Sequence, residues 1–189
     1  DVGGIDGEIE YSDRNTANMA QFGSDNKVAL EITKVVVGFE GSDNNTISAI
    51  QRGSGNNSYI KILKGSNKNS LRIAQFGTDS DATVLVEDGA DENTLKITQR
   101  GSDNNTELVV SEDSDNNTVK IFQAGSGNTV DMWDYFGIKD DSDYNHVMVS
   151  QRGSDNNSEV DIEVNSNRNI VVVGQAGSVN YSDIEIEDY

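Results

Sequence analysis

Apolar and polar residues alternate in short runs along this chain, and the runs recur at a nearly fixed distance. Each repeat reads Asn-x-ϕ-x-ϕ-x-Gln-x-Gly-x-x-Asn-x-[Ser/Thr]-x-ϕ-x-ϕ, where ϕ is an apolar residue. Strict alternation is the period of a strand that is buried on one face. Each repeat therefore predicts two short strands, joined by a turn after the Gln-x-Gly triplet. The seven repeats span residues 15–32, 45–62, 69–86, 93–110, 117–134, 145–162 and 169–186.

The repeat spacing predicts how these strand pairs are arranged. Four of the six intervals between successive repeat glutamines are 24 residues. A fixed period of this length indicates stacked repeats. We expect an all-β fold, a β-solenoid of seven stacked strand–turn–strand coils in which two parallel sheets face each other, as in a cross-β amyloid. Coils would lie about 4.8 Å apart and the sheets about 10 Å apart. Residues 1–14 match no complete repeat and are expected to form a flexible or targeting tail, and residues 187–189 a C-terminal tail.

Four polar or glycine positions recur in the repeat, and stacking would turn each into a column. An isolated buried amide costs a few kcal/mol, but amides stacked one per coil can bond along the stack. We therefore expect Asn and Gln ladders. The alternative is that these residues are exposed in turns, which stays open above all for the second Asn, a common turn residue. The columns comprise the first asparagines Asn15, Asn45, Asn69, Asn93, Asn117, Asn145 and Asn169, the glutamines Gln21, Gln51, Gln75, Gln99, Gln123, Gln151 and Gln175, the glycines Gly23, Gly53, Gly77, Gly101, Gly125, Gly153 and Gly177, and the second asparagines Asn26, Asn56, Asn104, Asn128, Asn156 and Asn180.

The pattern is interrupted at a few places. The links at residues 33–44 and 135–144 are longer than the others and occur at the same point of the coil, so both should bulge from one edge as surface loops. The third repeat has Ser80 in place of its second Asn. The fifth repeat ends with Asp134, where the others have Val or Ile.

The composition limits the chemistry. Lys and Arg number 14 against 33 Asp and Glu, which gives a net charge of −19. Such a chain would be repelled by nucleic acid and by anionic lipid. It has no run of about 18 apolar residues that could insert into a membrane. With no Cys and the single His146, neither a catalytic triad nor a multi-His metal site is possible. Carboxylate pairs are numerous but recur in turns, which favours surface charge over hydrolysis. We expect no enzyme activity and no cofactor.

Calcium is the alternative ligand that the acidic residues suggest. Asp140, Asp141 and Asp143 in the second long link, with the repeated Ser-Asp-Asn turns, offer the hard oxygen ligands that Ca²⁺ prefers. The nonapeptide pattern of calcium-binding β-rolls is absent. A solvated acidic face is the favoured interpretation.

The Gln-x-Gly-x-x-Asn motif, kept in six of the seven repeats, resembles that of curlins, the subunits of bacterial curli amyloid fibres. The family pattern is Ser-x5-Gln-x-Gly-x-x-Asn-x-Ala-x3-Gln, and the resemblance covers about residues 15–186. Here Asn replaces the leading Ser in every repeat, Ser or Thr mostly replaces Ala, and Ile or Val replaces the second Gln, as at Ile62 and Val110. The resemblance implies an extracellular fibre on the cell surface, export through an outer-membrane pore, a nucleator subunit as partner, and a role in biofilm adhesion.

The two ends of the repeat block predict the mode of assembly. The block holds whole coils, so its first and last rungs match, and no capping segment is predicted at either end. Soluble solenoids normally need caps, and an open strand edge is a template for another chain. Head-to-tail contact of this kind does not close, so the chain is expected to polymerise with itself into a filament. The alternative function is a monomeric acidic β-solenoid that binds other molecules, as a calcium-dependent matrix protein or an adhesin.

Overall fold

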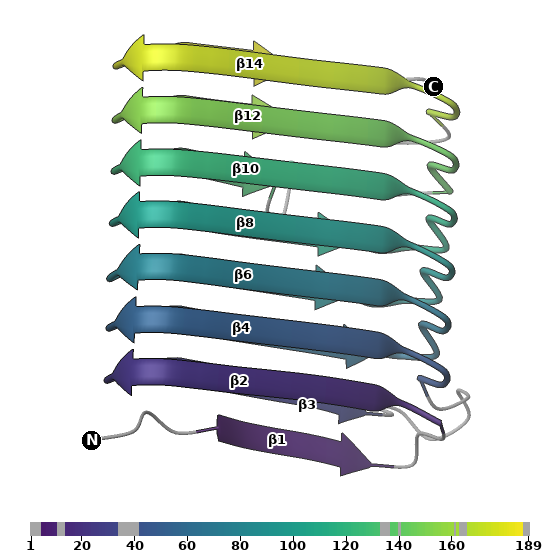
Figure 1. The fold of residues 1–189 in the computed structure, drawn as a ribbon. Helices are drawn as coiled ribbons and strands as arrows, with labels where there is room; N and C mark the ends of the chain where they lie inside the picture. Colours follow the sequence, from purple (N-terminus) through teal and green to yellow (C-terminus); the bar gives the residue numbers. More distant parts are fainter. Residues whose placement is uncertain are drawn as a thin grey trace.

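The computed structural model describes residues 5–10, 14–33, 42–132, 137–139, 141–160, 162 and 166–186. These residues form fifteen strands and no helix (Figure 1). The strands are β1 (Ile5–Glu10), β2 (Thr16–Ser24), β3 (Lys27–Thr33), β4 (Thr46–Ser54), β5 (Asn57–Leu63), β6 (Ser70–Thr78), β7 (Asp81–Val86), β8 (Thr94–Ser102), β9 (Asn105–Val110), β10 (Thr118–Ser126), β11 (Thr129–Met132), β12 (His146–Ser154), β13 (Asn157–Val160), β14 (Ile170–Ser178) and β15 (Tyr181–Ile184).

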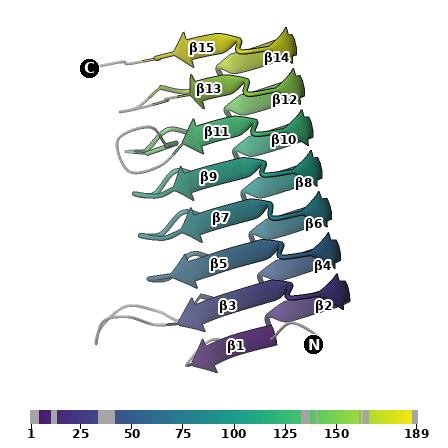
Figure 2. The same cartoon turned by 90° about the vertical axis from the view of Figure 1, so that its left-hand side faces the viewer.

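The strands form two parallel sheets that face each other (Figure 2). The seven-stranded sheet contains the even-numbered strands from β2 to β14, which are the first strands of the repeats. The eight-stranded sheet contains β1 and the second strands of the repeats, from β3 to β15. Each repeat thus supplies one strand to each sheet, and the chain rises by one coil per repeat. The β-solenoid predicted from the repeat is confirmed.

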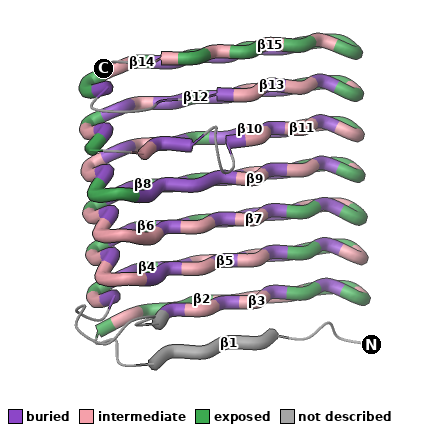
Figure 3. The backbone as a smooth tube through the Cα atoms, turned by 180° about the vertical axis from the view of Figure 1, so that it is seen from behind, coloured by how far each residue is buried: buried purple, intermediate pink, exposed green. Residues whose placement is uncertain are grey.

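Corresponding residues of successive repeats lie opposite one another. In the seven-stranded sheet Gln75 pairs with Gln99 and Gly77 with Gly101, and the same register holds from β2 to β14. Buried and exposed positions alternate along the strands (Figure 3). The inward residues form one apolar core of Ile, Val, Leu, Ala and Met side chains between the sheets. Residues that share a role in the repeat therefore form continuous columns through the molecule.

The turn between the two strands of each coil uses residues that tolerate a positive φ. The position before the second Asn has φ between 52° and 67° in every repeat. This left-handed conformation is accessible to Gly and, with a short polar side chain, to Asp. Six of the seven repeats have one of these two residues there, as at Gly55 and Asp103, whereas the last has Val179. The turns predicted after the Gln-x-Gly triplets are confirmed.

The N-terminal segment differs from the prediction. Residues 1–14 were expected to be a tail, but Ile5–Glu10 form strand β1, which pairs in parallel with β3. Ile5 lies opposite Val28, and Ile9 opposite Ile32. The expectation that no segment caps the N-terminal end is therefore wrong for the eight-stranded sheet. Among the described residues, the seven-stranded sheet ends at β2.

The fifth repeat also differs from the prediction. Its last core position falls not on Asp134, which lies outside the described residues, but on Ile138, which is fully buried. Ile138 bridges Val110 of the coil before and Ile162 of the coil after. The four extra residues of this repeat thus lie between the end of β11 and Ile138, and Ile138 completes the apolar column. Of the other long link, residues 34–41 lie outside the described residues.

No helix among the described residues is long and apolar enough to cross a membrane.

Candidate functional site: the ladders and the end rungs

The glutamine column is a continuous amide ladder inside the solenoid. Nε2 of each Gln donates to Oε1 of the Gln in the next coil, at 2.8–3.1 Å, in all six steps from Gln21 to Gln175. From Gln51 to Gln151 these residues are fully buried. In most coils Nε2 also donates to a turn carbonyl, as from Gln99 to the carbonyl of Asn104 at 3.0 Å. The prediction of a Gln ladder is confirmed, and all its bonds point toward the C-terminal coil.

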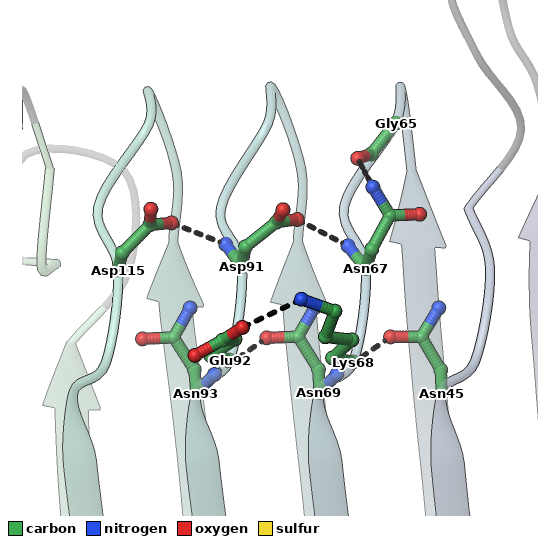
Figure 4. Close-up of polar contacts among 9 residues, drawn as sticks. All are labelled: Asn45, Gly65, Asn67, Lys68, Asn69, Asp91, Glu92, Asn93 and Asp115. Atoms are coloured by element: carbon green, nitrogen blue, oxygen red, sulfur yellow. Dashed lines mark hydrogen bonds and ion pairs between the residues drawn. The ribbon is translucent and has the colours of Figure 1, made fainter.

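The first asparagine column uses a different bond. Oδ1 of each Asn accepts the backbone N–H of the Asn one coil further on, at 2.8–2.9 Å (Figure 4). In the early coils Nδ2 donates to a link carbonyl of the next coil, as from Asn69 to Ala90 at 2.9 Å. The predicted stacking is present, but it joins side chain to backbone rather than amide to amide. The shorter Asn side chain reaches the backbone N–H of the next coil, whereas the longer Gln side chain reaches the side-chain amide of the next Gln.

The second asparagine column is buried from Asn26 to Asn156, which excludes the exposed-turn alternative there. Oδ1 of Asn128 accepts Nδ2 of Asn156 at 2.8 Å, and Nδ2 of Asn156 also donates to the carbonyl of Gly177. These amide bonds point toward the N-terminal coil, opposite to those of the Gln ladder. Ser80 interrupts this column and remains buried.

The glycine column lets adjacent coils approach closely. A Cβ on Gly101 would lie 1.9 Å from the carbonyl oxygen of Gly125, and its φ is +114°. The same conflict recurs at every member except Gly177, whose only neighbour within 4 Å is Nδ2 of Asn180 at 3.8 Å. Glycine is therefore required wherever another coil follows.

Two further columns run along the links and were missed in the sequence. One is a buried small residue, Ser66, Ala90 or Ser114 in successive coils. The other column is formed by the residue that directly follows each of these small residues. Its side-chain oxygen accepts a backbone N–H from the preceding coil, as Asp115 Oδ1 does from the N–H of Asp91 at 2.5 Å (Figure 4). The identity varies between Asp and Asn, and this hid the column. Its members are Asp43, Asn67, Asp91, Asp115, Asp143 and Asn167.

Stacked carboxylates in this link column disturb one another. Burial raises the pKa of Asp115 to about 6, against the bond from the Asp91 N–H that lowers it, and the charges of Asp91, Asp143 and Asp113 raise it further. Burial likewise raises the pKa of Asp91. The folded state therefore stabilises the protonated, neutral form of these two carboxyl groups relative to the charged form.

Two of the three calcium candidates, Asp141 and Asp143, lie within the part of the chain that the structure describes. Asp143 belongs to the link column, where its Oδ1 accepts the Asp115 N–H at 2.6 Å. Asp141 is exposed with a φ of 60°, and Asp140 lies outside the described residues. Among the described residues no group of three or more His, Asp or Glu side chains could hold a metal ion.

Among the described residues, no strand follows the last coil in either sheet. The seven-stranded sheet ends at β14 and the eight-stranded sheet at β15. In earlier coils the N–H of the residue after the first Asn donates to the Asn carbonyl of the next coil, as from His146 to Asn169 at 2.8 Å. Ile170 is the corresponding donor of the last described coil. The last rung therefore presents the unmatched half of every ladder.

One comparison with known proteins gave a match. A family model described as the curlin associated repeat matches residues 42–85, which include most of the second and third repeats. This supports the resemblance that the Gln-x-Gly-x-x-Asn motif suggested. Comparison with curated proteins and with solved structures gave no significant match.

Proposed function

We propose that this chain, which carries the curlin associated repeat, is a structural subunit that polymerises head to tail into an extracellular fibre. The observation that carries the proposal is the continuity of the ladders. Each repeats the same bond in the same direction from coil to coil, up to the last described coil of β14 and β15, whose outward-facing bonding groups match those of every internal coil. Curlins are structural proteins rather than enzymes, which agrees with a function located in the stack itself.

The bonds inside the chain indicate the joint between two copies. The N–H of Ile170 would donate to the carbonyl of the second copy's Asn15, repeating the bond from His146 to Asn169. Oδ1 of Asn169 would accept the N–H of that same Asn15, as Asn145 does for Asn169 within the chain. Gly177 leaves the space that a following coil needs. The joint then has the geometry of any internal step of the solenoid.

Strand β1 occupies part of this joint. It lies along β3, where β15 of a preceding copy would have to pair. Through the register of the sheet, residues 5–6 correspond to residues 182–183 of the last repeat, so that in sequence residues 5–10 align with residues 182–187. The two sequences are Ile-Asp-Gly-Glu-Ile-Glu and Ser-Asp-Ile-Glu-Ile-Glu, with four of six residues identical. β1 therefore stands in for the half-coil of a neighbouring subunit, and fibre growth requires β15 of that subunit to displace it.

Incubation of the purified chain tests the proposal. We expect unbranched fibrils in electron micrographs and a diffraction spacing of about 4.8 Å along the fibril axis. The chain lacking residues 1–13 should assemble with a shorter lag, because its β3 edge is open. A protein that stays monomeric in both forms at high concentration would refute the fibre. Equal lags with normal fibrils would refute only the role of β1.

The cellular setting follows from the resemblance. We propose that the subunit is exported through an outer-membrane pore, that a nucleator subunit starts assembly, and that the fibre serves adhesion in a biofilm. Expression with and without such a pore, followed by immunogold labelling of intact cells, tests the first step. Labelled surface fibres should be present only when the pore is supplied.

A further inference from the structure

The outer face of the seven-stranded sheet is basic although the protein is strongly acidic. Counting the outward positions of strands β2 to β14, this basic face carries no Asp or Glu. All six of its cationic side chains are exposed. The cations of the basic face are Arg52, Arg72, Lys96, Arg100, Lys120 and Arg152.

These cations have no acidic partner among the residues that the structure describes. None of the six forms an ion pair with another described residue, whereas Lys61, Lys64 and Lys68, which lie elsewhere, all do. Three of the arginines lie over phenylalanine rings instead. The guanidinium carbon lies 5.1 Å from the ring centroid for Arg52 over Phe22, and 5.7 Å for Arg100 over Phe76 and for Arg152 over Phe122. Such cation–π contacts hold the guanidinium groups against the face without neutralising them. In a chain of net charge −19, a face that gathers six exposed cations and no carboxylate indicates a surface that meets an acidic partner.

The outer face of the eight-stranded sheet has the opposite charge. From β7 to β15 its outward strand positions carry five carboxylates and no Lys or Arg among the described residues. Four of them stack in consecutive coils, because the register pairs Glu107 with Asp131, Asp131 with Glu159 and Glu159 with Asp183. Burial raises the pKa of Glu107, and the charge of Asp131 adds to this. This acidic face, defined by Asp81, Glu107, Asp131, Glu159 and Asp183, would gain from an external cation column.

The charges on the two faces are opposite in sign and have the same spacing. On the basic face the register pairs Arg72 with Lys96 and Lys96 with Lys120, so three cations stack in consecutive coils. Both columns repeat once per coil, at about 4.8 Å, and both lie on sheet faces. Beside the cation column is a shallow hollow of about 270 Å³, lined in part by Lys120, Phe122 and Met148, which can admit an opposing side chain.

We propose that the acidic face of one copy packs on the basic face of another, so that solenoids associate side by side. The partner is a second copy of this chain because the chain itself carries the complementary column at the same spacing. This contact is separate from the head-to-tail joint and would bundle the filaments that we propose. At about 0.15 M salt the Debye length is about 8 Å, which screens repulsion between whole molecules more than attraction between charges in contact.

Charge reversal on each face tests the proposal. Filaments of three variants are compared with wild type by electron microscopy at 0.15 M salt: Lys96→Glu with Lys120→Glu on the basic face, Glu107→Lys with Asp131→Lys on the acidic face, and all four together. Wild-type filaments should lie in pairs or bundles. Each double variant should give mainly single filaments, and the fourfold variant should recover bundling because the charges are exchanged.

A control separates the faces from net charge. Lys68→Glu with Arg168→Glu, at the link edge, changes the net charge by as much as the basic-face variant and should leave bundling intact. In about 1 M salt, where the Debye length is about 3 Å, wild-type bundles should separate into single filaments. Double variants that bundle like wild type, or a fourfold variant that stays single, would overturn the proposal. The proposal would also be overturned if wild-type filaments bound polyglutamate but never lay side by side. The basic face would then bind an acidic polymer rather than a second copy of the chain. Filament formation in every variant keeps this test independent of the head-to-tail joint.

Discussion

Replacing Asp115 by asparagine should stabilise the protein at neutral pH and remove part of its pH dependence. Asp115 Oδ1 accepts the N–H of Asp91 in the link column. An asparagine retains this acceptor, because asparagines already accept the same bond elsewhere in the column. Asn67 Oδ1 accepts the N–H of Asp43 at 2.6 Å, and Asn167 Oδ1 accepts the N–H of Asp143 at 2.5 Å. The substitution therefore keeps the hydrogen bond and removes only the buried negative charge.

The size of the effect follows from the pKa. Burial raises the pKa of Asp115 from 3.8 to about 6. The folded state thus holds the proton more tightly than the unfolded state, so stability is greatest below about pH 4 and falls as the pH rises to about 6. At 1.36 kcal/mol per unit the full shift corresponds to about 3 kcal/mol. Because much of the side chain is solvent-accessible, screening reduces this, and we expect about 1 kcal/mol.

Urea unfolding of freshly desalted monomer, followed by circular dichroism at pH 7 and pH 4, measures the effect. With a slope of about 1–3 kcal/mol/M, the midpoint of Asp115→Asn should rise by about 0.3–1 M at pH 7 and should not change at pH 4. Asp103→Asn, in an exposed turn on the other edge, is the matched control and should shift neither midpoint. Equal stabilisation by Asp115→Asn at both pH values, or none at pH 7, would show that charge in the link column is not what limits stability.

Four further substitutions test the columns and the ends. Gln99→Leu leaves Gln75 Nε2 and Gln123 Oε1 without their ladder partner and should cost about 2–4 kcal/mol in urea unfolding; an unchanged midpoint would contradict the ladder. Gly101→Ala places a Cβ 1.9 Å from the Gly125 carbonyl at a positive φ and should strip amide-exchange protection from the coils on either side, whereas Ala74→Gly on the same sheet should not. Ile138→Ala should cost about 2–4 kcal/mol, because it opens a cavity between Val110 and Ile162; a small effect would argue against its core position. Val179→Gly relieves a β-branched residue at a φ of 57° and should raise exchange protection in β14 by about 1 kcal/mol, and unchanged protection would mean that this turn carries no strain.

The sequence identified the columns that consist of one residue type. Gln99 and Asn93 recur with the same neighbours at 24-residue intervals, and identical residues at a fixed period must stack if the repeats stack. The link column escaped because its members alternate between Asp and Asn, and they sit in a segment that reads as a turn. Its function depends only on a side-chain oxygen at the right height, which both residues supply.

Ile138 and β1 escaped for a different reason. The fifth repeat reaches its last core position four residues late, and only the bridges to the coils on either side show which residue fills it. Ile5–Glu10 have no Asn or Gln marker and form only one strand, so they match no complete repeat. Such a strand is held in place by an edge left open elsewhere in the molecule, and nothing local in its sequence announces that edge.

The sequence by itself determined the fold class, the number of coils, the register and the identity of the Gln, Asn and Gly columns, because alternation and a strict period are local properties that stacking only copies. The tertiary structure decided how each ladder bonds, since Gln reaches the next amide whereas the shorter Asn reaches the next backbone N–H. It also decided that β1 covers β3, that cations gather on the outer face of the seven-stranded sheet, and that carboxylates gather on the outer face of β7 to β15. These features depend on which residues of distant coils become neighbours, and a single repeat carries no record of that.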